Sequence, residues 1–311
     1  MSAVKIENLR KKYGSVHALD GLTMQVEPGS VFGFLGPNGA GKTTTLRILA
    51  GLASSNSGSI DLGVPLDDKT NAGKLARIGY LPEEPAFYPW MTPKEYLDIV
   101  GKIFKIDNAE RRKRVGQLLE QSGLKDVAKR RIGGFSRGMR QRLGLAQSLV
   151  NHPQILLLDE PVSALDPAGR KEVLEMIEGL GSECTVIMSS HILADVERVC
   201  DTVGIINHGK LVVQAPKQEL LDRYAIPALE LTTANGMAAS MPDWQKRLEK
   251  LPAVTGVVIE GYAFHIAVKD VHVAQQEIMQ DALTHNSIFE KLEVVKPSLE
   301  DIFMQLTGSQ K

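Results

Sequence analysis

The sequence has few cysteines and no long apolar run. Its 311 residues include two cysteines, Cys184 and Cys200, whose apolar surroundings and spacing favour buried thiols in a reducing compartment over a disulfide framework or a metal centre. No segment approaches 18 consecutive apolar residues, so we do not expect the chain itself to span a membrane. The amino terminus lacks the apolar core of a signal peptide.

Neither sign of charge is in excess. The chain has 36 Lys and Arg against 37 Asp and Glu, a formal net charge of -1, so no overall field favours nucleic acid or an anionic membrane. We therefore expect no nucleic-acid partner. The content of 43% hydrophobic and 23% charged residues is typical of a soluble globular protein. The length allows one large domain and a smaller one.

A glycine-rich loop follows the first buried strand. Residues 31–35, VFGFL, run into GPNGAGKTT and then into a helical segment, which is G-x-x-x-x-G-K-[ST] in the strand, loop and helix context that the motif requires. Such a loop closes its backbone N–H groups around phosphates, while Lys42 reaches the outer phosphates and Thr43 binds magnesium. A loop that merely turns the chain is the alternative. The expected nucleotide contacts are Gly36, Pro37, Asn38, Gly39, Ala40, Gly41, Lys42, Thr43 and Thr44.

Two adjacent carboxylates follow a second buried strand. The run Ile155 to Leu158 ends in Asp159 and Glu160, and ligands of open α/β sheets lie beyond the carboxyl ends of strands. The pair predicts a cation site or a proton transfer, with a solvated strand end as the alternative. In P-loop proteins an acid at this place holds magnesium through water, which suits Asp159. Glu160 can then act as the general base.

A second helix start with phosphate-binding character lies between these strands. In GGFSRGMRQRLGLAQSLVNHP, residues 133–153, Ser136 is a good N-cap and an apolar stripe follows at helical spacing. A serine and a glycine at a helix start can hold a phosphate, yet the first loop already provides for one nucleotide. Here the sequence resembles the ATP-binding-cassette family, in which a signature helix of one subunit closes on the nucleotide of another.

The resemblance covers about the first 220 residues and implies further roles. Tyr13 matches the aromatic residue that stacks on adenine, and Ser136 and Gly138 match the signature that acts in trans. Asp166 matches the aspartate of the D-loop, also in trans, and His191 matches the switch histidine that senses the outermost phosphate. Taken singly, Tyr13 reads as a strand aromatic, Asp166 as an N-cap and His191 as a surface residue.

The sequence departs from the family pattern in two places. Glu83, in IGYLPEE, stands where family members usually carry a glutamine, and it adds a negative charge beside Asp159 and Glu160. We expect Glu83 to approach the magnesium ion. In the signature, Arg137 replaces a glycine and Met139 a glutamine. These variants resemble exporter ATPases whose membrane subunits are separate chains.

Residues 85–132 form a helical insertion, within a helical subdomain of about 85–150. Thr92, Pro93 and Glu95 make a capping box with proline at the first helical position. From residue 110 to 142 there are eleven Lys or Arg against three Asp or Glu. Such an excess usually indicates a solvated face, and nucleic-acid binding is the alternative. The resemblance implies a third role, in which this region and the Glu83 loop hold the coupling helices of a membrane partner.

The residues after about 225 are predicted to form a separate unit. Its alternating and helical patterns give the order βαββαβ, which predicts a small α+β domain over 226–311 with ferredoxin-like order. A last helix, SLEDIFMQL, has Ser298 as its N-cap and resembles the ending of extensions on some exporter ATPases. We expect this domain to serve dimer contact or regulation.

These observations predict an α/β P-loop cassette over 1–225, with a mixed sheet and a helical subdomain, followed by the α+β domain. The resemblance implies an ATPase subunit of an ATP-binding-cassette exporter that uses ATP and Mg²⁺. It would form a homodimer or heterodimer and drive separate integral membrane permease subunits from the cytoplasmic face of the cell membrane. A soluble cassette ATPase acting on nucleic acid or ribosomes is the alternative, disfavoured by the single phosphate loop and the absence of sustained heptads. A regulatory module without turnover is disfavoured by Asp159, Glu160 and His191.

Overall fold

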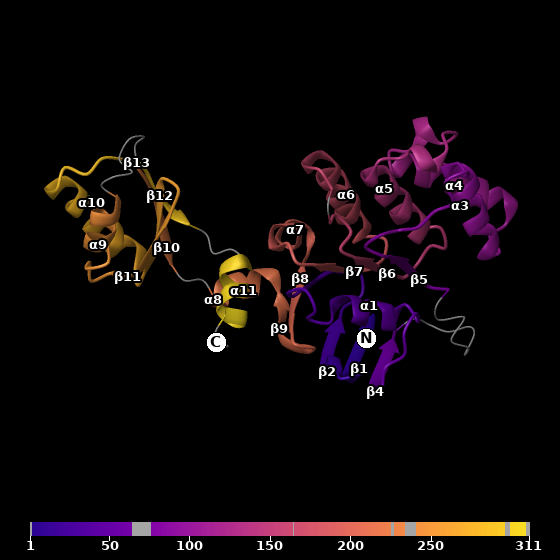
Figure 1. The fold of residues 1–311 in the computed structure, drawn as a ribbon, viewed down its shortest axis with the longest axis horizontal. Coiled ribbons are helices and arrows are strands. Elements are labelled where there is room, and N and C mark those ends of the chain that lie inside the picture. Colours follow the sequence, from indigo (N-terminus) through magenta and orange to yellow (C-terminus); the bar gives the residue numbers. More distant parts are fainter. Residues whose placement is uncertain are drawn as a thin grey trace. The chain divides into compact units, whose positions relative to one another are not determined.

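The computed structural model describes residues 2–63, 76–163, 165–224, 227–233, 241–295 and 299–308. The chain divides into two compact units, Met1–Lys217 and Gln218–Lys311, whose elements are labelled in Figure 1. Ser298, the predicted N-cap of the last helix, lies outside the described residues. Within the described part of the chain, no helix is long and apolar enough to cross a lipid bilayer.

A six-stranded sheet forms the centre of the first unit, and its mixed strand directions confirm the mixed sheet that the sequence predicts. Its order is β5-β6-β7-β3-β8-β9; the first five of these strands are parallel, and β9 runs antiparallel to β8. Every residue of β3, β6 and β7 is buried, so these strands carry apolar side chains on both faces. Their parallel pairing brings their carboxyl ends to one edge of the sheet. The strands are β3 (Val31–Leu35), β5 (Ile78–Leu81), β6 (Ile155–Asp159), β7 (Thr185–Ser190), β8 (Thr202–Asn207) and β9 (Lys210–Pro216).

A three-stranded antiparallel sheet lies below the central one (Figure 1), in the order β2-β1-β4. Helix α1 (Lys42–Leu49) lies between the two sheets, where Leu46 and Leu49 join the apolar core that both sheets share. Burial of this face anchors the helix, so its first residues stay at the carboxyl end of β3. The strands of this sheet are β1 (Val4–Tyr13), β2 (Val16–Val26) and β4 (Ser57–Leu62).

The helices that follow surround the other face of the central sheet (Figure 1). They are α3 (Pro93–Ile103), α4 (Asn108–Gln121), α5 (Arg137–Ser148), α6 (Pro167–Leu180) and α7 (Leu193–Val199), with short 3-10 turns at Lys125–Val127 and Ile132–Gly134. The capping box at α3 is confirmed: the Thr92 hydroxyl accepts from the Glu95 N–H, and the Glu95 carboxylate accepts from the Thr92 N–H.

The basic excess between residues 110 and 142 is not wholly a solvated face. Arg111 and Arg114 are buried in α4. The Arg111 Nε donates to Asp98 Oδ1 at 2.7 Å, and an Arg114 guanidinium N–H donates to the carbonyl of Leu149 at 2.7 Å. These two arginines therefore join α4 to its neighbours, because a buried guanidinium requires such partners.

The second unit contains a four-stranded antiparallel sheet with two helices packed on one face. The sheet order is β11-β12-β10-β13, and Trp244 of α9 packs edge-on against Phe264 of β12 in its core. Its assignment to ferredoxin-like folds stays a prediction. The elements are α8 (Lys217–Tyr224), β10 (Ala228–Thr233), α9 (Met241–Leu248), β11 (Val254–Glu260), β12 (Ala263–Val268), α10 (Val271–Thr284), β13 (Phe289–Val295) and α11 (Leu299–Gly308).

Candidate functional site

The loop between β3 and α1 needs glycine at two positions. Gly41 has a φ of 111°, and a Cβ there would lie 2.6 Å from the carbonyl oxygen of Ala18. A Cβ on Gly36 would lie 2.4 Å from the carbonyl oxygen of Ile206. At Gly41 only glycine tolerates both the left-handed backbone and the nearby carbonyl oxygen, and at Gly36 a side chain would collide with the neighbouring carbonyl oxygen. The loop is therefore a fixed cradle rather than a simple turn.

Lys42 begins α1 and points back into this cradle. Its Nζ donates to the carbonyl oxygens of Gly36 at 2.6 Å and Pro37 at 3.4 Å. The same ammonium lies 3.5 Å from Glu160 Oε1, and both side chains are about nine-tenths buried or more. The buried ammonium is held by carbonyl oxygens and a carboxylate, and phosphate oxygens of a ligand can replace these partners.

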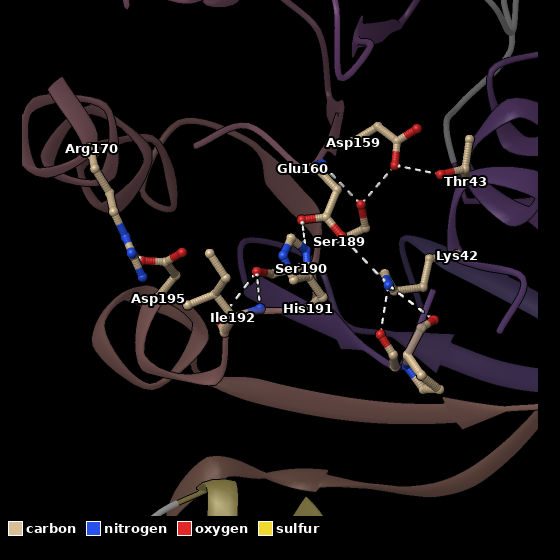
Figure 2. A network of polar contacts seen from close by, with 12 residues as sticks. Lys42, Thr43, Asp159, Glu160, Arg170, Ser189, Ser190, His191, Ile192 and Asp195 are labelled. Carbon is tan, nitrogen blue, oxygen red and sulfur yellow. Dashed lines mark hydrogen bonds and ion pairs between the residues drawn. The ribbon is translucent and has the colours of Figure 1, made fainter. Parts of the chain in front are cut away.

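Asp159 ends β6 beside the start of α1. Its Oδ1 accepts hydrogen bonds from Thr43 Oγ1 at 3.0 Å and Ser189 Oγ at 2.8 Å (Figure 2). A hydroxyl and a carboxylate at this separation are oxygen ligands that suit magnesium, which uses few protein groups together with substrate phosphates. Among the described residues, no group of three or more His, Cys, Asp or Glu side chains is placed to hold a metal ion. The donor set thus fits magnesium held jointly with a phosphorylated ligand.

Glu160 has an unusual backbone conformation. Its φ of 47° is left-handed, which costs a non-glycine residue about 1–2 kcal/mol. The Glu160 N–H donates to Ser189 Oγ at 3.0 Å. Its carboxylate lies between two groups, with Oε2 2.8 Å from His191 Nδ1 and Oε1 3.5 Å from Lys42 Nζ (Figure 2). The strained backbone therefore places this carboxylate between an ammonium and an imidazole.

Lys42, Thr43, Glu160 and His191 line one pocket together with most of the loop residues expected to bind nucleotide. Glu83 also lines it, so the loop after β5 reaches the same space. Val16 and Ala18 of β2 were not predicted, because small apolar residues carry no chemical signal for a ligand. The lining residues are Val16, Ala18, Pro37, Asn38, Gly39, Ala40, Gly41, Lys42, Thr43, Thr44, Glu83, Glu160 and His191.

Six predicted residues are not among the lining residues, namely Tyr13, Gly36, Ser136, Gly138, Asp159 and Asp166. Tyr13 is 50% exposed, and the Lys11 ammonium lies 4.8 Å from its ring centre. Gly138 lies in the first turn of α5, where the Ser136 hydroxyl accepts from the Met139 N–H. Asp166 likewise caps α6. Within this chain, Ser136 and Asp166 thus serve as helix N-caps, and their roles in trans stay predictions.

Two polar contacts near the pocket were missed by the sequence reasoning. Ser189 connects the two acids, as described above, although a serine in an apolar strand gives no sign of its partners. Arg170 Nε donates to Asp195 Oδ1 at 2.6 Å, which joins α6 to α7. Asp195 is buried, and this burial raises the pKa of its carboxyl despite the arginine.

Two family models match the chain. Residues 19–163 match the model described as ABC transporter, and residues 216–307 match the model described as ATP-binding protein DrrA1-3-like, C-terminal domain. The first match includes the glycine loop, Asp159 and Glu160. The second covers the small antiparallel sheet and its helices.

Curated relatives extend over nearly the whole chain. The uncharacterized ABC transporter ATP-binding protein YxlF of Bacillus subtilis (strain 168) is 38% identical over 97% of this chain and 99% of its own length. The bacitracin transport ATP-binding protein BcrA of Bacillus licheniformis is 36% identical over 98% of this chain and 97% of its own. Both likenesses therefore include the small domain as well as the cassette.

A solved structure matches the first part of the chain. It is described as the ATP binding subunit of an ABC transporter, and it is 27% identical, with a TM-score of 0.64, over 72% of this chain and 93% of its own. ATP-binding subunits of this kind dimerise and work with membrane permeases. The chain belongs to the ABC transporter ATP-binding proteins and is an ATPase subunit, as its glycine cradle, its paired acids and the relatives that match nearly its whole length show.

Proposed function

We propose that this chain hydrolyses MgATP in the described pocket and powers export of a substrate through separate membrane subunits. The observation that carries the proposal is the Glu160 carboxylate, which lies between Lys42 and His191 and next to the Thr43–Asp159 pair. The name of BcrA concerns bacitracin transport, which supports a transporter role here without identifying this chain's substrate.

The loop and Lys42 bind the phosphates. Backbone N–H groups at a helix start favour negative charge, and Lys42 exchanges the carbonyls of Gly36 and Pro37 for phosphate oxygens. Thr43 and Asp159 are the residues that would hold magnesium, which when bound neutralises charge on the phosphate oxygens. Binding thus replaces internal contacts of the site with contacts to the nucleotide.

Glu160 acts as general base for the attacking water. A carboxylate accepts a proton from water in a pocket that fixes its geometry, and both oxygens of Glu160 already have partners that fix it. His191 Nδ1 contacts Glu160, which leaves Nε2 as the ring nitrogen that would contact the terminal phosphate. Lys42 moves toward the phosphates on binding, so the ion pair with Glu160 weakens and that oxygen becomes free to take the proton.

Two chains share each nucleotide, in a head-to-tail dimer. The position of Ser136, Gly138 and Asp166 outside the pocket of their own chain supports a role for them in a partner's pocket. Tyr13 pairs across the β1–β2 hairpin with Val16, which lines the pocket. This neighbourhood supports adenine stacking on Tyr13.

Complementation between two damaged chains tests the shared site. Lys42→Ala removes the phosphate contact, and Ser136→Asp keeps an N-cap while placing a carboxylate against phosphate. Each variant alone should lose hydrolysis, and a mixture of differently tagged chains should regain part of it, because one site in each heterodimer is intact. Heterodimers that are isolated by both tags and remain inactive would contradict the proposal. Recovery by this chain alone also shows that it can form homodimers.

The surface around the loop after β5 is proposed to hold the permease. Tyr88 and Trp90 are exposed, with ring centres 5.2 Å apart, and Tyr96 of α3 lies 6.4 Å from Tyr88. Exposed apolar patches mark interaction sites, and this one lies next to Glu83 in sequence. Trp90→Ala should reduce recovery of the chain with membranes that contain the permease and leave its own ATP binding unchanged. Tyr262→Ala, an exposed tyrosine of the second unit, is the control.

The chain is proposed to act at the cytoplasmic face of the cell membrane, with 1–225 as the nucleotide-binding domain and 226–311 as an accessory domain for dimer contact or regulation. The compact units and the two family matches support such a division near residue 217. The nucleic-acid alternative is weakened by Arg111 and Arg114, since both have internal partners and are buried.

A further inference from the structure

Ser189 contacts both acids of the site at once. It is fully buried in β7, next to the end of β6. Its hydroxyl donates to Asp159 Oδ1 at 2.8 Å and accepts from the Glu160 N–H at 3.0 Å (Figure 2). One side chain from the neighbouring strand thus fixes a carboxylate and the backbone of the next residue.

The two hydrogen bonds of Ser189 fix different groups, one a carboxylate and the other a backbone N–H. The bond to Asp159 orients the carboxylate through Oδ1, the oxygen that also accepts from Thr43. The bond from Glu160 satisfies a buried N–H at a residue with a left-handed backbone. Strained conformations persist where the surroundings determine them strongly, so this bond helps to hold the Glu160 side chain toward Lys42 and His191.

The Ser189 bonds do not depend on nucleotide contacts. Thr43 and Lys42 must both exchange partners when nucleotide binds, since each is expected to contact the ligand. Ser189 is fully buried and, like Asp159, is absent from the residues that line the pocket. Its bonds can therefore persist while the other partners of Asp159 and Glu160 change.

We propose that Ser189 is a positioning residue that orients Asp159 toward magnesium and holds Glu160 in its catalytic geometry. The inference rests on the roles proposed above for those two acids. Ser189 itself touches neither substrate nor metal in this scheme. Its effect should therefore appear in how magnesium strengthens nucleotide binding and in turnover, and not in binding of nucleotide without the metal.

Ser190 provides a matched control. It is a neighbouring serine with 1% exposure, and its hydroxyl also donates one bond and accepts another. Those bonds go to the carbonyl oxygen and N–H of Ile192, at 3.2 Å and 2.9 Å, and reach neither acid. Ser190→Ala thus also removes one donated and one accepted bond of a serine in the same strand, while the contacts of Asp159 and Glu160 remain.

The test compares Ser189→Ala and Ser190→Ala in the full chain, with Ser189→Cys as a second variant of similar size should the alanine variant fold poorly. Binding of a fluorescent ATP analogue is measured in EDTA and across a magnesium titration, and hydrolysis is measured at saturating magnesium. Because one bond to a charged group is lost, we expect the magnesium needed for half-maximal enhancement of binding to rise by about 10-fold in Ser189→Ala. Binding in EDTA should change less than about twofold.

The outcomes separate this inference from the proposed function. A Ser189→Ala chain with the magnesium dependence and turnover of Ser190→Ala overturns the positioning role. Glu160→Gln is assayed beside them: if it hydrolyses ATP at the wild-type rate, the proposed catalytic assignment fails instead. Loss of turnover in Glu160→Gln together with a raised magnesium requirement in Ser189→Ala supports both.

Discussion

His191 Nδ1 lies 2.8 Å from Glu160 Oε2, and this contact joins the residue that follows β7 to the residue that follows β6. The other oxygen of the same carboxylate lies 3.5 Å from Lys42 Nζ. Glu160 is thereby held on both sides while its backbone has a left-handed φ. Such a fixed carboxylate at the mouth of a phosphate cradle is suited to proton transfer from a bound water.

Glu160→Gln should leave ATP binding intact and lower turnover. The amide keeps the shape of the side chain but is a poor proton acceptor, so we expect turnover to fall about 100-fold to 10,000-fold. Glu178→Gln, on an exposed face of α6, is the control and should hydrolyse normally. With the charge removed, ATP should also favour the closed dimer. Hydrolysis and size-exclusion chromatography with and without ATP provide the measurements, and a variant that stays monomeric at saturating ATP counts against the shared site.

Gly41→Ala should abolish tight ATP binding. The left-handed backbone costs about 1–2 kcal/mol for alanine, and the added Cβ would lie 2.6 Å from the Ala18 carbonyl oxygen. The loop must therefore shift and lose its cradle. Gly116→Ala is the matched control, because Gly116 lies inside α4 with no atom within 4 Å of the added Cβ. There the change should raise stability by about 0.5–1 kcal/mol. Normal ATP affinity in Gly41→Ala would show that the loop adapts freely.

Sequence patterns were sufficient for the parts of the site that depend on local order. The glycine loop, the two acids at the end of β6 and the N-cap at Ser136 each follow from spacing within one segment. The partners of Glu160 could not be predicted, because Lys42 and His191 come from elements far apart in the chain. Ser189 shows the same limit, since its role depends on the register of β6 against β7. The basic run near Arg111 was misjudged in part because burial of arginine depends on tertiary packing.

The pH dependence of stability should differ in sign between two aspartates. Burial raises the pKa of the Asp195 carboxyl above its ordinary value near 3.8, although the Arg170 guanidinium opposes this. The folded chain therefore holds this proton more tightly than the unfolded chain, and the Asp195 contribution is lost as pH rises through the folded pKa. Replacement by asparagine removes that titration. The free energy of unfolding of Asp195→Asn, relative to wild type, should thus increase as pH rises from 3.8 through that window.

Asp98 provides the opposite case. Hydrogen bonds from Lys102 and Arg111 lower the pKa of the Asp98 carboxyl, so its contribution to stability is present above the unfolded pKa and is lost as pH falls through the folded pKa. Asp98→Asn should therefore cost stability at neutral pH and cost less in acid. Urea unfolding of both variants and wild type across the acid range gives the measurement. Parallel pH profiles for the two variants would contradict the opposite assignments.

The sharpest prediction concerns Glu83, where the sequence departs from the glutamine usual in the family. The structure places Glu83 among the residues that line the pocket, just beyond β5, which pairs with the strand that ends at Asp159. A carboxylate there attracts magnesium if it reaches the ion, and repels Glu160 if it does not. The ion is the largest local charge when it is bound, so we expect attraction to prevail.

Glu83→Gln should keep ATP affinity and part of the hydrolysis, but it should require more magnesium for the half-maximal rate. Glu84→Gln is the control, because Glu84 is the next residue, is absent from the pocket lining and lies 3.5 Å from Arg137. It should leave the magnesium requirement unchanged. Titration of magnesium at fixed ATP compares the three chains. An equal requirement in Glu83→Gln and wild type would falsify contact with the ion and would leave Glu83 as a residue of the surface that meets the permease.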